Sequence, residues 1–274
     1  MAVPTSSRLD CGAGVPVRVN PARRSPGLLL FQVAGELLMT AGVIALLFVA
    51  WALWWTNVEA DAGQAAAVKQ FIQQNSVPAP AAPAAGSLPA PTGGPEAAGS
   101  APPVGKAPGR GQAIAVVYIP RFGADYSRPI VQGTSQEVLD TLGLGHYEGT
   151  AMPGELGNFV VAGHRQTHGA VLDEIHTLVP GDKIYVQTAD AFYTYVYRNG
   201  EIVLPDRTDV LLPVPGEPNA KPASRIMTMT SCNPRFGSEE RIIAYSVFES
   251  WQPLSAGPPA AIAKQLAELQ GQGK

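Results

Sequence analysis

Residues 225–248 of this chain, RIMTMTSCNPRFGSEERIIAYSVF, decide its fold. Two runs in this stretch, 225–231 and 241–248, are rich in Ile, Met, Val and Thr and alternate roughly with period 2, which is typical of β-strands. The eight-residue connection between Cys232 and Arg241 contains a turn-forming Asn-Pro pair. A hairpin-like return would bring Arg241, at the start of the second strand, back towards Cys232 at the end of the first.

The sequence on either side of this hairpin, from residue 112 to 252, predicts a mainly β domain. Short apolar runs separated by turn residues are typical of a barrel or a sandwich, and two helical pieces, 135–142 and 169–178, interrupt them. Ser135 stands where it could cap the first of these helices. We expect a mostly antiparallel barrel of eight or nine short strands, at 113–120, 129–131, 158–161, 183–186, 191–196, 200–203, 226–230 and 242–248.

The composition separates this domain from the N-terminal part of the chain. Of 274 residues 46% are hydrophobic and only 15% are charged, yet 29 glycines and 26 prolines are too many for one compact fold throughout. The excess is concentrated in residues 77–112, which are almost entirely Ala, Pro, Gly and Ser, so we expect a disordered spacer there. The predicted plan is a helical stub and linker at 57–111, a folded domain at 112–252 and a tail at 253–274 that contains a short helix.

An apolar segment before the spacer predicts a membrane anchor. Residues 37–55 carry no charge, and their length fits one transmembrane helix, which we place at 36–56. Three tryptophans at its C-terminal end, Trp51, Trp54 and Trp55, are typical of an interfacial belt. A cleaved signal peptide is the alternative, but the apolar core is too long and lacks a small-residue cleavage site just after it.

The flanking charges predict the orientation of this anchor. Residues 1–35 carry four arginines against Asp10, whereas Glu59 and Asp61 follow the apolar segment, so we expect a cytoplasmic N-terminus and an extracytoplasmic folded domain. Cys11 and Cys232 would then lie on opposite sides of the membrane and could not pair. An unpaired thiol in an oxidising compartment points to a reactive role.

Three side chains at predicted strand ends supply the groups that cysteine acyl transfer needs. Cys232 is the candidate nucleophile, and His164, which follows the apolar run 158–161, is the candidate base that would generate its thiolate. Arg241 could donate hydrogen bonds to a peptide carbonyl or an oxyanion. The spacing alone leaves Arg165 and Arg235 as competitors for that role.

The sequence argues against other classes of function. The net charge of -3 and the lack of a basic run after the apolar segment argue against a nucleic-acid partner. We expect no metal and no cofactor, since no Cys-x-x-Cys occurs and the His164–His168 pair has no third ligand nearby in sequence. His146 is expected to be structural.

Three motifs in order resemble the sortases. They are residues 143–158, GLGHYEGTAMPGELGN, then VAGHR at 161–165, then TMTSC at 228–232 with Arg241. The resemblance covers roughly residues 112–250 and is strongest to the class E housekeeping sortases of high-GC Gram-positive bacteria. It implies an eight-stranded sortase barrel and makes 112–252 a catalytic domain.

The resemblance also implies a reaction. It makes the protein a transpeptidase that cleaves a C-terminal sorting signal of LPXTG type, in class E an LAXTG signal, and passes the protein to an amine of a peptidoglycan precursor or cross-bridge. Carried over by motif, Cys232 attacks the Thr carbonyl, His164 is the general acid and base, and Arg241 steadies substrate and oxyanion.

Four further positions are expected to face the substrate. The family pattern before the cysteine is usually Thr-Leu-x-Thr-Cys, so Thr230 belongs to the motif and Ser231 replaces a threonine while keeping its hydroxyl and the hydrogen bond expected there. Tyr126 stands where class E sortases tend to carry a tyrosine linked to signal preference, and an exposed loop aromatic is the alternative. His168 lies in a loop just after His164 and could line the cleft.

Three alternatives to wall sorting stay open. The same Cys-His pair would serve an anchored cysteine peptidase that transfers to water, a pilin-polymerising sortase would transfer to another protein, and a silent anchored binding module would not react. The products formed from an LAXTG peptide and an amine would distinguish them.

Overall fold

The computed structural model describes residues 26–75 and 101–271. The chain divides into two compact units between Phe48 and Val49. The described part of the first unit is helical and lies within α1, Pro26–Ala50, while the second unit contains all the strands.

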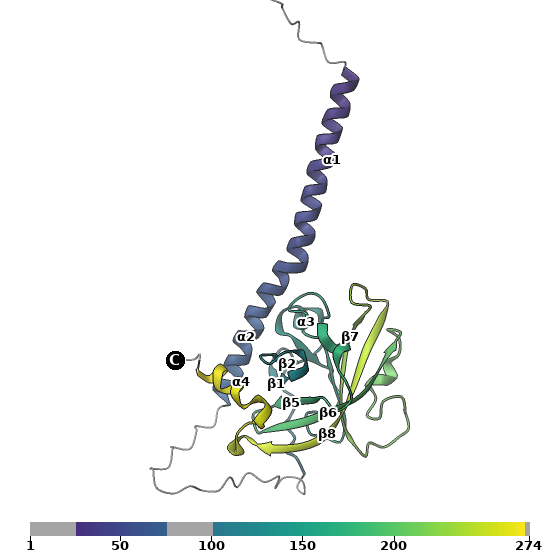
Figure 1. Cartoon of the computed structure of the whole chain (residues 1–274). Coiled ribbons are helices and arrows are strands. Elements are labelled where there is room, and N and C mark those ends of the chain that lie inside the picture. The colour runs from purple at the N-terminus through teal and green to yellow at the C-terminus, as the bar shows by residue number, and fades with distance from the viewer. Residues whose placement is uncertain (1–25, 76–100, 272–274) are drawn as a thin grey trace, which may run out of the picture. The chain divides into compact units, whose positions relative to one another are not determined.

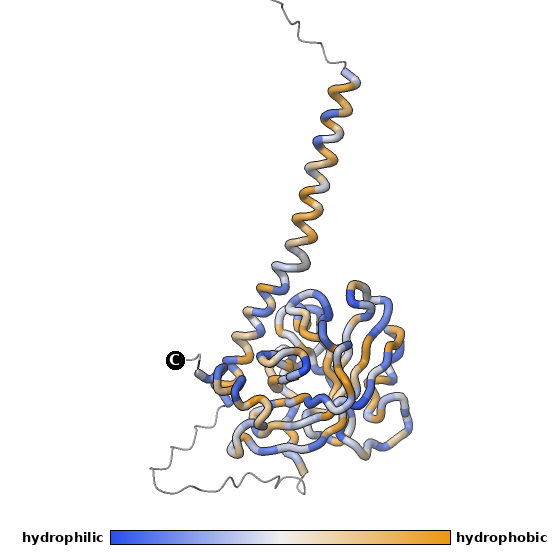
Figure 2. Tube along the Cα trace, viewed as in Figure 1, coloured by the Kyte–Doolittle hydropathy of each residue, from blue (hydrophilic) through white to orange (hydrophobic). Residues whose placement is uncertain are grey.

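Helix α1 is long and apolar enough to cross a membrane. Its 25 residues rise about 38 Å at 1.5 Å per residue, which exceeds the roughly 30 Å of a bilayer's hydrocarbon core. Figure 2 shows apolar residues along most of its length. The helix begins ten residues before the start expected at 36, so Glu36 falls inside it.

The second unit is a closed barrel of eight strands (Figure 1). Its strand order is β1-β2-β3-β4-β7-β8-β6-β5, and only the pairs β2/β3 and β4/β7 are parallel. The mainly β, mostly antiparallel barrel predicted from the sequence is therefore confirmed. The strands are β1 Ala113–Tyr118, β2 Ser127–Gln132, β3 Leu144–His146, β4 Gly157–Ala162, β5 Lys183–Gln187, β6 Ala191–Val203, β7 Arg225–Asn233 and β8 Glu240–Pro253.

Two strand predictions are wrong in detail. The sequence does not predict β3, because three residues are too few to show alternation. Gly145 is needed in this strand because a Cβ there would lie 2.4 Å from the Gly133 carbonyl oxygen. The runs 191–196 and 200–203 form one strand, β6, which passes a register shift between Tyr197 and Asn199. The polar residues at this register shift look like a turn in the sequence, so the sequence predicts two strands there.

The helix predictions also need correction. Helix α3 spans Gln136–Leu142, but the Ser135 side chain at its N-cap position makes no capping hydrogen bond. The helix expected at 169–178 is only a 3-10 turn, Asp173–Thr177. His168 and Ala170 have φ angles of 54° and 44°, and such left-handed backbone cannot belong to a right-handed helix.

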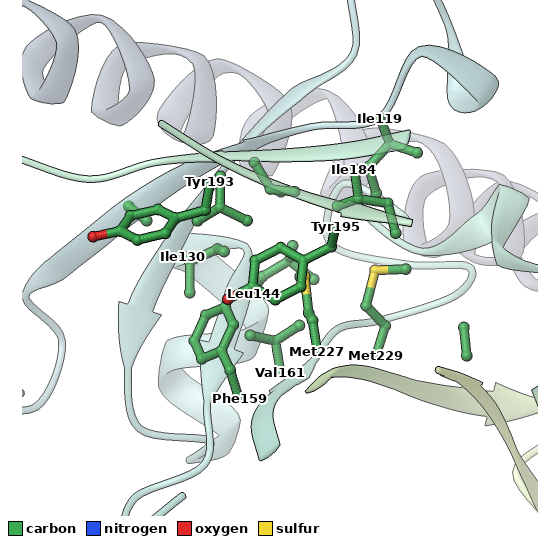
Figure 3. Close-up of a cluster of buried hydrophobic side chains, with 14 of the residues drawn as sticks. Ile119, Ile130, Leu144, Phe159, Val161, Ile184, Tyr193, Tyr195, Met227 and Met229 are labelled. Carbon is green, nitrogen blue, oxygen red and sulfur yellow. The ribbon is translucent and has the colours of Figure 1, made fainter. Parts of the chain in front are cut away.

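The barrel interior holds the main hydrophobic core and orients β7. Met227 and Met229 point inwards among side chains from the other strands, as Figure 3 shows. Since side chains alternate along a strand, Thr228, Thr230 and Cys232 project to the outer face. The alternation thus carries the candidate nucleophile out of the core at the end of the strand.

Two helices cover part of the outside of the barrel (Figure 1). Helix α2, Thr56–Gln74, follows a π-helical turn at Trp51–Trp55, and helix α4 spans Ala260–Gly271. Their apolar side chains share a second core with β1, β5 and β6, which contains Val68, Phe71, Ile72, Val116, Tyr118, Tyr185, Phe192, Ile262 and Leu266. The predicted helical stub and tail helix are therefore parts of the folded unit.

The end of the predicted spacer also contacts the barrel. The Tyr193 hydroxyl donates to the Pro103 carbonyl over 2.6 Å, and the Gly111 amide donates to the Gln132 carbonyl over 2.8 Å. These bonds hold residues from about 101 onwards, so the expected spacer is shorter at its C-terminal end. The rest of it, residues 76–100, lies outside the described residues.

Candidate active site

The β7/β8 hairpin places Cys232 directly opposite Arg241. The two residues are partners in the antiparallel register, next to the end of β7 and the start of β8. Directly opposed side chains lie on the same face with Cβ atoms about 5 Å apart. The hairpin predicted from residues 225–248 is therefore confirmed.

The parallel pair β4/β7 places His164 beside Cys232. Its register holds a constant offset of 68 residues, from Gly157 opposite Arg225 to Ala162 opposite Thr230, and His164 and Cys232 have the same offset. The two chains stay together beyond the ladder, because the Gly163 amide donates to the Thr230 carbonyl over 3.2 Å. The backbone that carries His164 therefore runs beside the end of β7, and Arg241 lies opposite Cys232 on the other neighbouring strand.

The His164 ring is held by a residue that the sequence does not single out. Its Nε2 lies 2.6 Å from Oδ1 of Asp140, which α3 carries. A carboxylate on one ring nitrogen orients the imidazole, and it leaves Nδ1 to exchange a proton with a thiol or an amine. No sequence signal identifies Asp140, which lies 24 residues before His164 on a separate helix.

His168 joins this pair. Its Nδ1 lies 3.7 Å from the same Asp140 oxygen, and its ring centroid is 5.2 Å from that of His164. The three side chains could hold a metal ion, since their ligand atoms lie within 4.8 Å of one another. However, two ligands of a tetrahedral zinc ion would be about 3.3 Å apart, so the 2.6 Å contact is a direct hydrogen bond.

The three candidate arginines have different surroundings. Arg165 is buried and donates from Nη1 to the Cys232 carbonyl over 3.3 Å and to the Asn233 side chain. Arg235 pairs with Asp173. Arg241 is half-buried, and both of its hydrogen bonds within the described residues use Nη1, which donates to two backbone carbonyls over 2.8 Å.

This comparison favours Arg241 for contact with a reacting group. Of five guanidinium N–H groups, those on Nε and Nη2 stay available beside Cys232. Arg165 instead fixes the backbone that carries the thiol.

The two motif residues before Cys232 are buried and support the site. The Ser231 hydroxyl donates to the Gly163 carbonyl over 2.7 Å, so the hydrogen bond expected there is present. It ties β7 to the chain just before His164. Thr230 is 6% exposed and lies opposite Ile243 of β8. The Ser231 hydroxyl is therefore already bonded, and substrate contact by Ser231 and Thr230 stays a prediction.

Tyr126 also supports the backbone near His164. Its hydroxyl donates to the Val171 carbonyl over 2.6 Å, and its ring contacts Phe122 edge to face. Burial raises the pKa of Tyr126. Its role in signal preference stays a prediction, and the structure adds that the hydroxyl is already bonded.

The sequence does not single out Tyr147, which is half-buried. It follows β3, and its amide donates to the Val160 carbonyl over 3.0 Å, which continues the pairing with β4. Burial is the main cause that raises the pKa of Tyr147; the charge of Arg241 opposes this rise and Cys232 adds to it. The phenol is thus within electrostatic range of both site residues.

His146 is buried, as expected for a structural residue. Its Nδ1 lies 2.9 Å from the Gln132 side chain and its Nε2 lies 3.0 Å from the Ala151 carbonyl. Burial lowers the pKa of His146, mainly by removing the charged form from water.

A buried amide fixes the connection between β6 and β7 over the outer face. The Asn158 side chain donates to the carbonyls of Val210 and Leu212, each over 3.0 Å, and accepts from the Thr228 hydroxyl over 2.6 Å. The connection therefore packs over the strands that carry His164 and Cys232.

Comparisons with known proteins agree with this architecture. The Sortase domain family model matches residues 117–249. Sortase SrtE1 of Streptomyces coelicolor is 36% identical over 90% of this chain and 66% of its own length, and Sortase SrtE2 of the same organism is 31% identical over 81% and 85%. The chain thus spans just under two thirds of the SrtE1 sequence.

Solved structures give the same result. The SrtA sortase from Actinomyces oris is 37% identical with a TM-score of 0.57, covering 60% of this chain and 94% of its own. Sortase E1 from S. coelicolor, solved with a tripeptide in the active site, is 37% identical with a TM-score of 0.51, covering 58% and 99%.

The fold and site define a barrel that places a thiol, an imidazole and a guanidinium at one end of adjacent strands. The chain belongs to the sortase family. Its similarity to SrtE1, SrtE2 and sortase E1 is consistent with class E. Sortases are cysteine transpeptidases, so the family, the barrel and the enzyme class predicted from the sequence are those found.

Proposed function

We propose that this protein is a membrane-anchored transpeptidase that cleaves an LPXTG-type sorting signal, with preference for LAXTG, and transfers the cleaved protein to a cell-wall amine. The observation that carries the proposal is the position of Cys232, which lies opposite Arg241 in the antiparallel register on a strand that pairs in parallel with β4, the strand just before His164. A peptide substrate is also supported by the tripeptide in the active site of the related sortase E1.

The acylation step uses the three side chains together. The Cys232 thiolate attacks the carbonyl carbon of the signal's threonine, and the carbonyl oxygen becomes an oxyanion that accepts hydrogen bonds from Arg241. As the Thr–Gly C–N bond breaks, protonated His164 gives its proton from Nδ1 to the leaving amine. The product is a thioester on Cys232 and a free glycine amine.

The second step reverses these roles. An incoming amine attacks the thioester carbonyl and gives a proton to His164, and the Cys232 thiolate leaves. The new amide replaces the old one, so atoms and charges balance without a further reactant. Asp140 holds the imidazole in one orientation during both proton transfers.

The location follows from α1 and the charge asymmetry around it. A single span with arginine-rich residues before it would leave the barrel outside the cytoplasmic membrane, where the sorting signals and the wall amines are. The acceptor is a peptidoglycan precursor or cross-bridge amine, as the resemblance implies.

Product analysis tests the proposal. The full-length chain in detergent is incubated with a fluorescent LAXTG peptide and excess triglycine, and the products are identified by mass spectrometry. We expect the ligated peptide as the main product, faster turnover than with LPXTG, and no turnover by Cys232→Ala with an unchanged melting temperature.

Other outcomes select other functions. Pure hydrolysis with every amine tested would indicate an anchored cysteine peptidase, and transfer only to a lysine of a protein subunit would indicate a pilin-polymerising enzyme. Binding of the peptide without any turnover would indicate a silent binding module.

A further inference from the structure

The loop that follows β4, residues 164–170, needs support from outside itself. We call it the histidine loop because it carries His164 and His168. His168 and Ala170 have positive φ angles of 54° and 44°, a conformation that costs free energy for residues other than glycine. Such backbone persists when its surroundings hold it in place.

Helix α2 supplies that support through two amide side chains. Asn57 accepts from the Gly169 amide over 2.9 Å and donates to the Gln166 carbonyl over 3.1 Å. Gln64 donates to the His168 carbonyl over 3.1 Å. Asn57 and Gln64 are seven residues apart, so they lie on one face of the helix.

The contact between α2 and this loop is close and buried. Gln64 has no exposed surface, and a Cβ atom at Gly169 would lie 2.8 Å from its Oε1. Gly169 also has a positive φ angle of 87°. The loop backbone therefore lies so close to α2 that only glycine fits at position 169.

The same helix packs against the element that carries Asp140. Helices α2 and α3 are in contact, and Gly63 of α2 lies near the Thr141 carbonyl, the residue after Asp140. Asp61 pairs with Arg128 of β2 over 2.8 Å. Helix α2 thus contacts both the loop of His164 and the helix of its carboxylate partner.

Helix α2 is itself fixed to the barrel. Val68, Phe71 and Ile72, in its C-terminal half, are buried in the second core with Val116 and Tyr118 of β1. The hydrogen bonds to the histidine loop come from the N-terminal half. One end of the helix is fastened to the strands, and the other end holds the loop.

We propose that α2 is a positioning element of the active site, in which Asn57 and Gln64 hold the histidine loop so that His164 stays between Asp140 and Cys232. The proposal rests on the proposed function, since it assigns His164 to the reaction. It makes the segment between the apolar helix and the spacer part of the catalytic unit, where the sequence indicates only a helical stub.

Kinetics of full-length variants in detergent test this role. Asn57→Ala and Gln64→Ala should each lower kcat with the LAXTG peptide roughly 10- to 100-fold, because small displacements of a catalytic group are costly, with little change in KM. Asn57→Asp keeps the oxygen that accepts from Gly169 and should recover part of the rate. The matched control is Gln70→Ala, the same substitution at an exposed position of α2.

A spectroscopic readout separates this proposal from the proposed function. NMR of Asn57→Ala should show faster exchange of the Gly169 amide and changed ring chemical shifts of His164, with both unchanged in Gln70→Ala. These measurements test the role of α2 even if the wild-type chain has no transpeptidase activity. A double variant of Asn57 and Gln64 that keeps the wild-type ring chemical shifts of His164 and the wild-type Gly169 exchange would overturn the proposal.

Discussion

At the scale of single residues, the imidazole of His164 has distinct partners on its two sides. Oδ1 of Asp140 lies 2.6 Å from Nε2, and the pairing of β4 with β7 brings the chain before His164 alongside the chain before Cys232. A carboxylate that is hydrogen-bonded to a base fixes the orientation of its ring. The rate should therefore depend on the charge and hydrogen-bonding capacity of Asp140 as well as on its size.

Replacing Asp140 by Asn tests this dependence. The amide has the same shape but lacks the negative charge, so we expect kcat to fall about 10- to 100-fold with KM nearly unchanged. Steady-state kinetics with the LAXTG peptide would measure it. A variant as active as the wild type would show that Asp140 does not position His164.

Ser231 offers a second test, of stability. Ser231→Ala leaves the Gly163 carbonyl without the hydroxyl at 2.7 Å, and an unpaired buried carbonyl costs about 1–3 kcal/mol. Ser231→Thr restores the residue typical of the family and keeps the donor. Denaturant unfolding should show the loss in the alanine variant and most of the wild-type free energy of unfolding in the threonine variant.

His146 predicts a pH dependence of stability. Burial lowers its pKa in the folded state below the ordinary value of 6.5, so below that pH the unfolded chain binds a proton that the folded chain does not. Stability is therefore present above pH 6.5 and falls as the pH decreases. His146→Gln cannot titrate, so its free energy of unfolding should fall less steeply between pH 7 and 5. Parallel slopes would contradict the assignment.

The sequence identifies some of these residues and not others, for a geometric reason. Cys232 and Arg241 are close in sequence, and a hairpin between two readable strands predicts that they meet. The approach of His164 to Cys232 depends on the parallel pairing of β4 with β7, which no local sequence pattern predicts. Asp140, Asn57 and Gln64 reach the site from helices whose placement depends on tertiary packing.

At the scale of elements, the connection between β6 and β7 is held over the outer face by one buried amide. Asn158→Ala would free the Val210 and Leu212 carbonyls and the Thr228 hydroxyl. We expect faster limited proteolysis within residues 204–224 and a higher KM for the peptide. Asn199→Ala, on the exposed part of β6, is the matched control. Equal proteolysis of both variants would exclude a role in holding the connection.

The element boundaries predicted from the sequence are wrong where the backbone geometry departs from the local sequence pattern. The apolar periodicity of 169–178 favours a helix, but left-handed backbone at 168–170 prevents it, and contacts with α2 stabilise that backbone. In β6, a bulge lets a polar stretch continue the strand. In both cases tertiary contacts override local propensity.

At the scale of the whole molecule, chemical labelling of the two cysteines tests the predicted membrane orientation. If α1 spans the membrane with the N-terminus inside, a membrane-impermeant maleimide added to intact cells should label Cys232 and not Cys11. Wild type should then be labelled and Cys232→Ala should not, whereas permeabilised cells should label both proteins. Labelling of Cys232→Ala in intact cells would contradict the orientation.

The most direct test of the central claim is to trap the acyl intermediate. Full-length chain mixed with an LAXTG peptide in the absence of amine, quenched in acid and digested, should yield a peptide containing Cys232 that carries the acyl group up to the threonine. The account predicts this thioester in the wild type and its loss in Cys232→Ala. An adduct on another residue, or transpeptidation by Cys232→Ala, would contradict it.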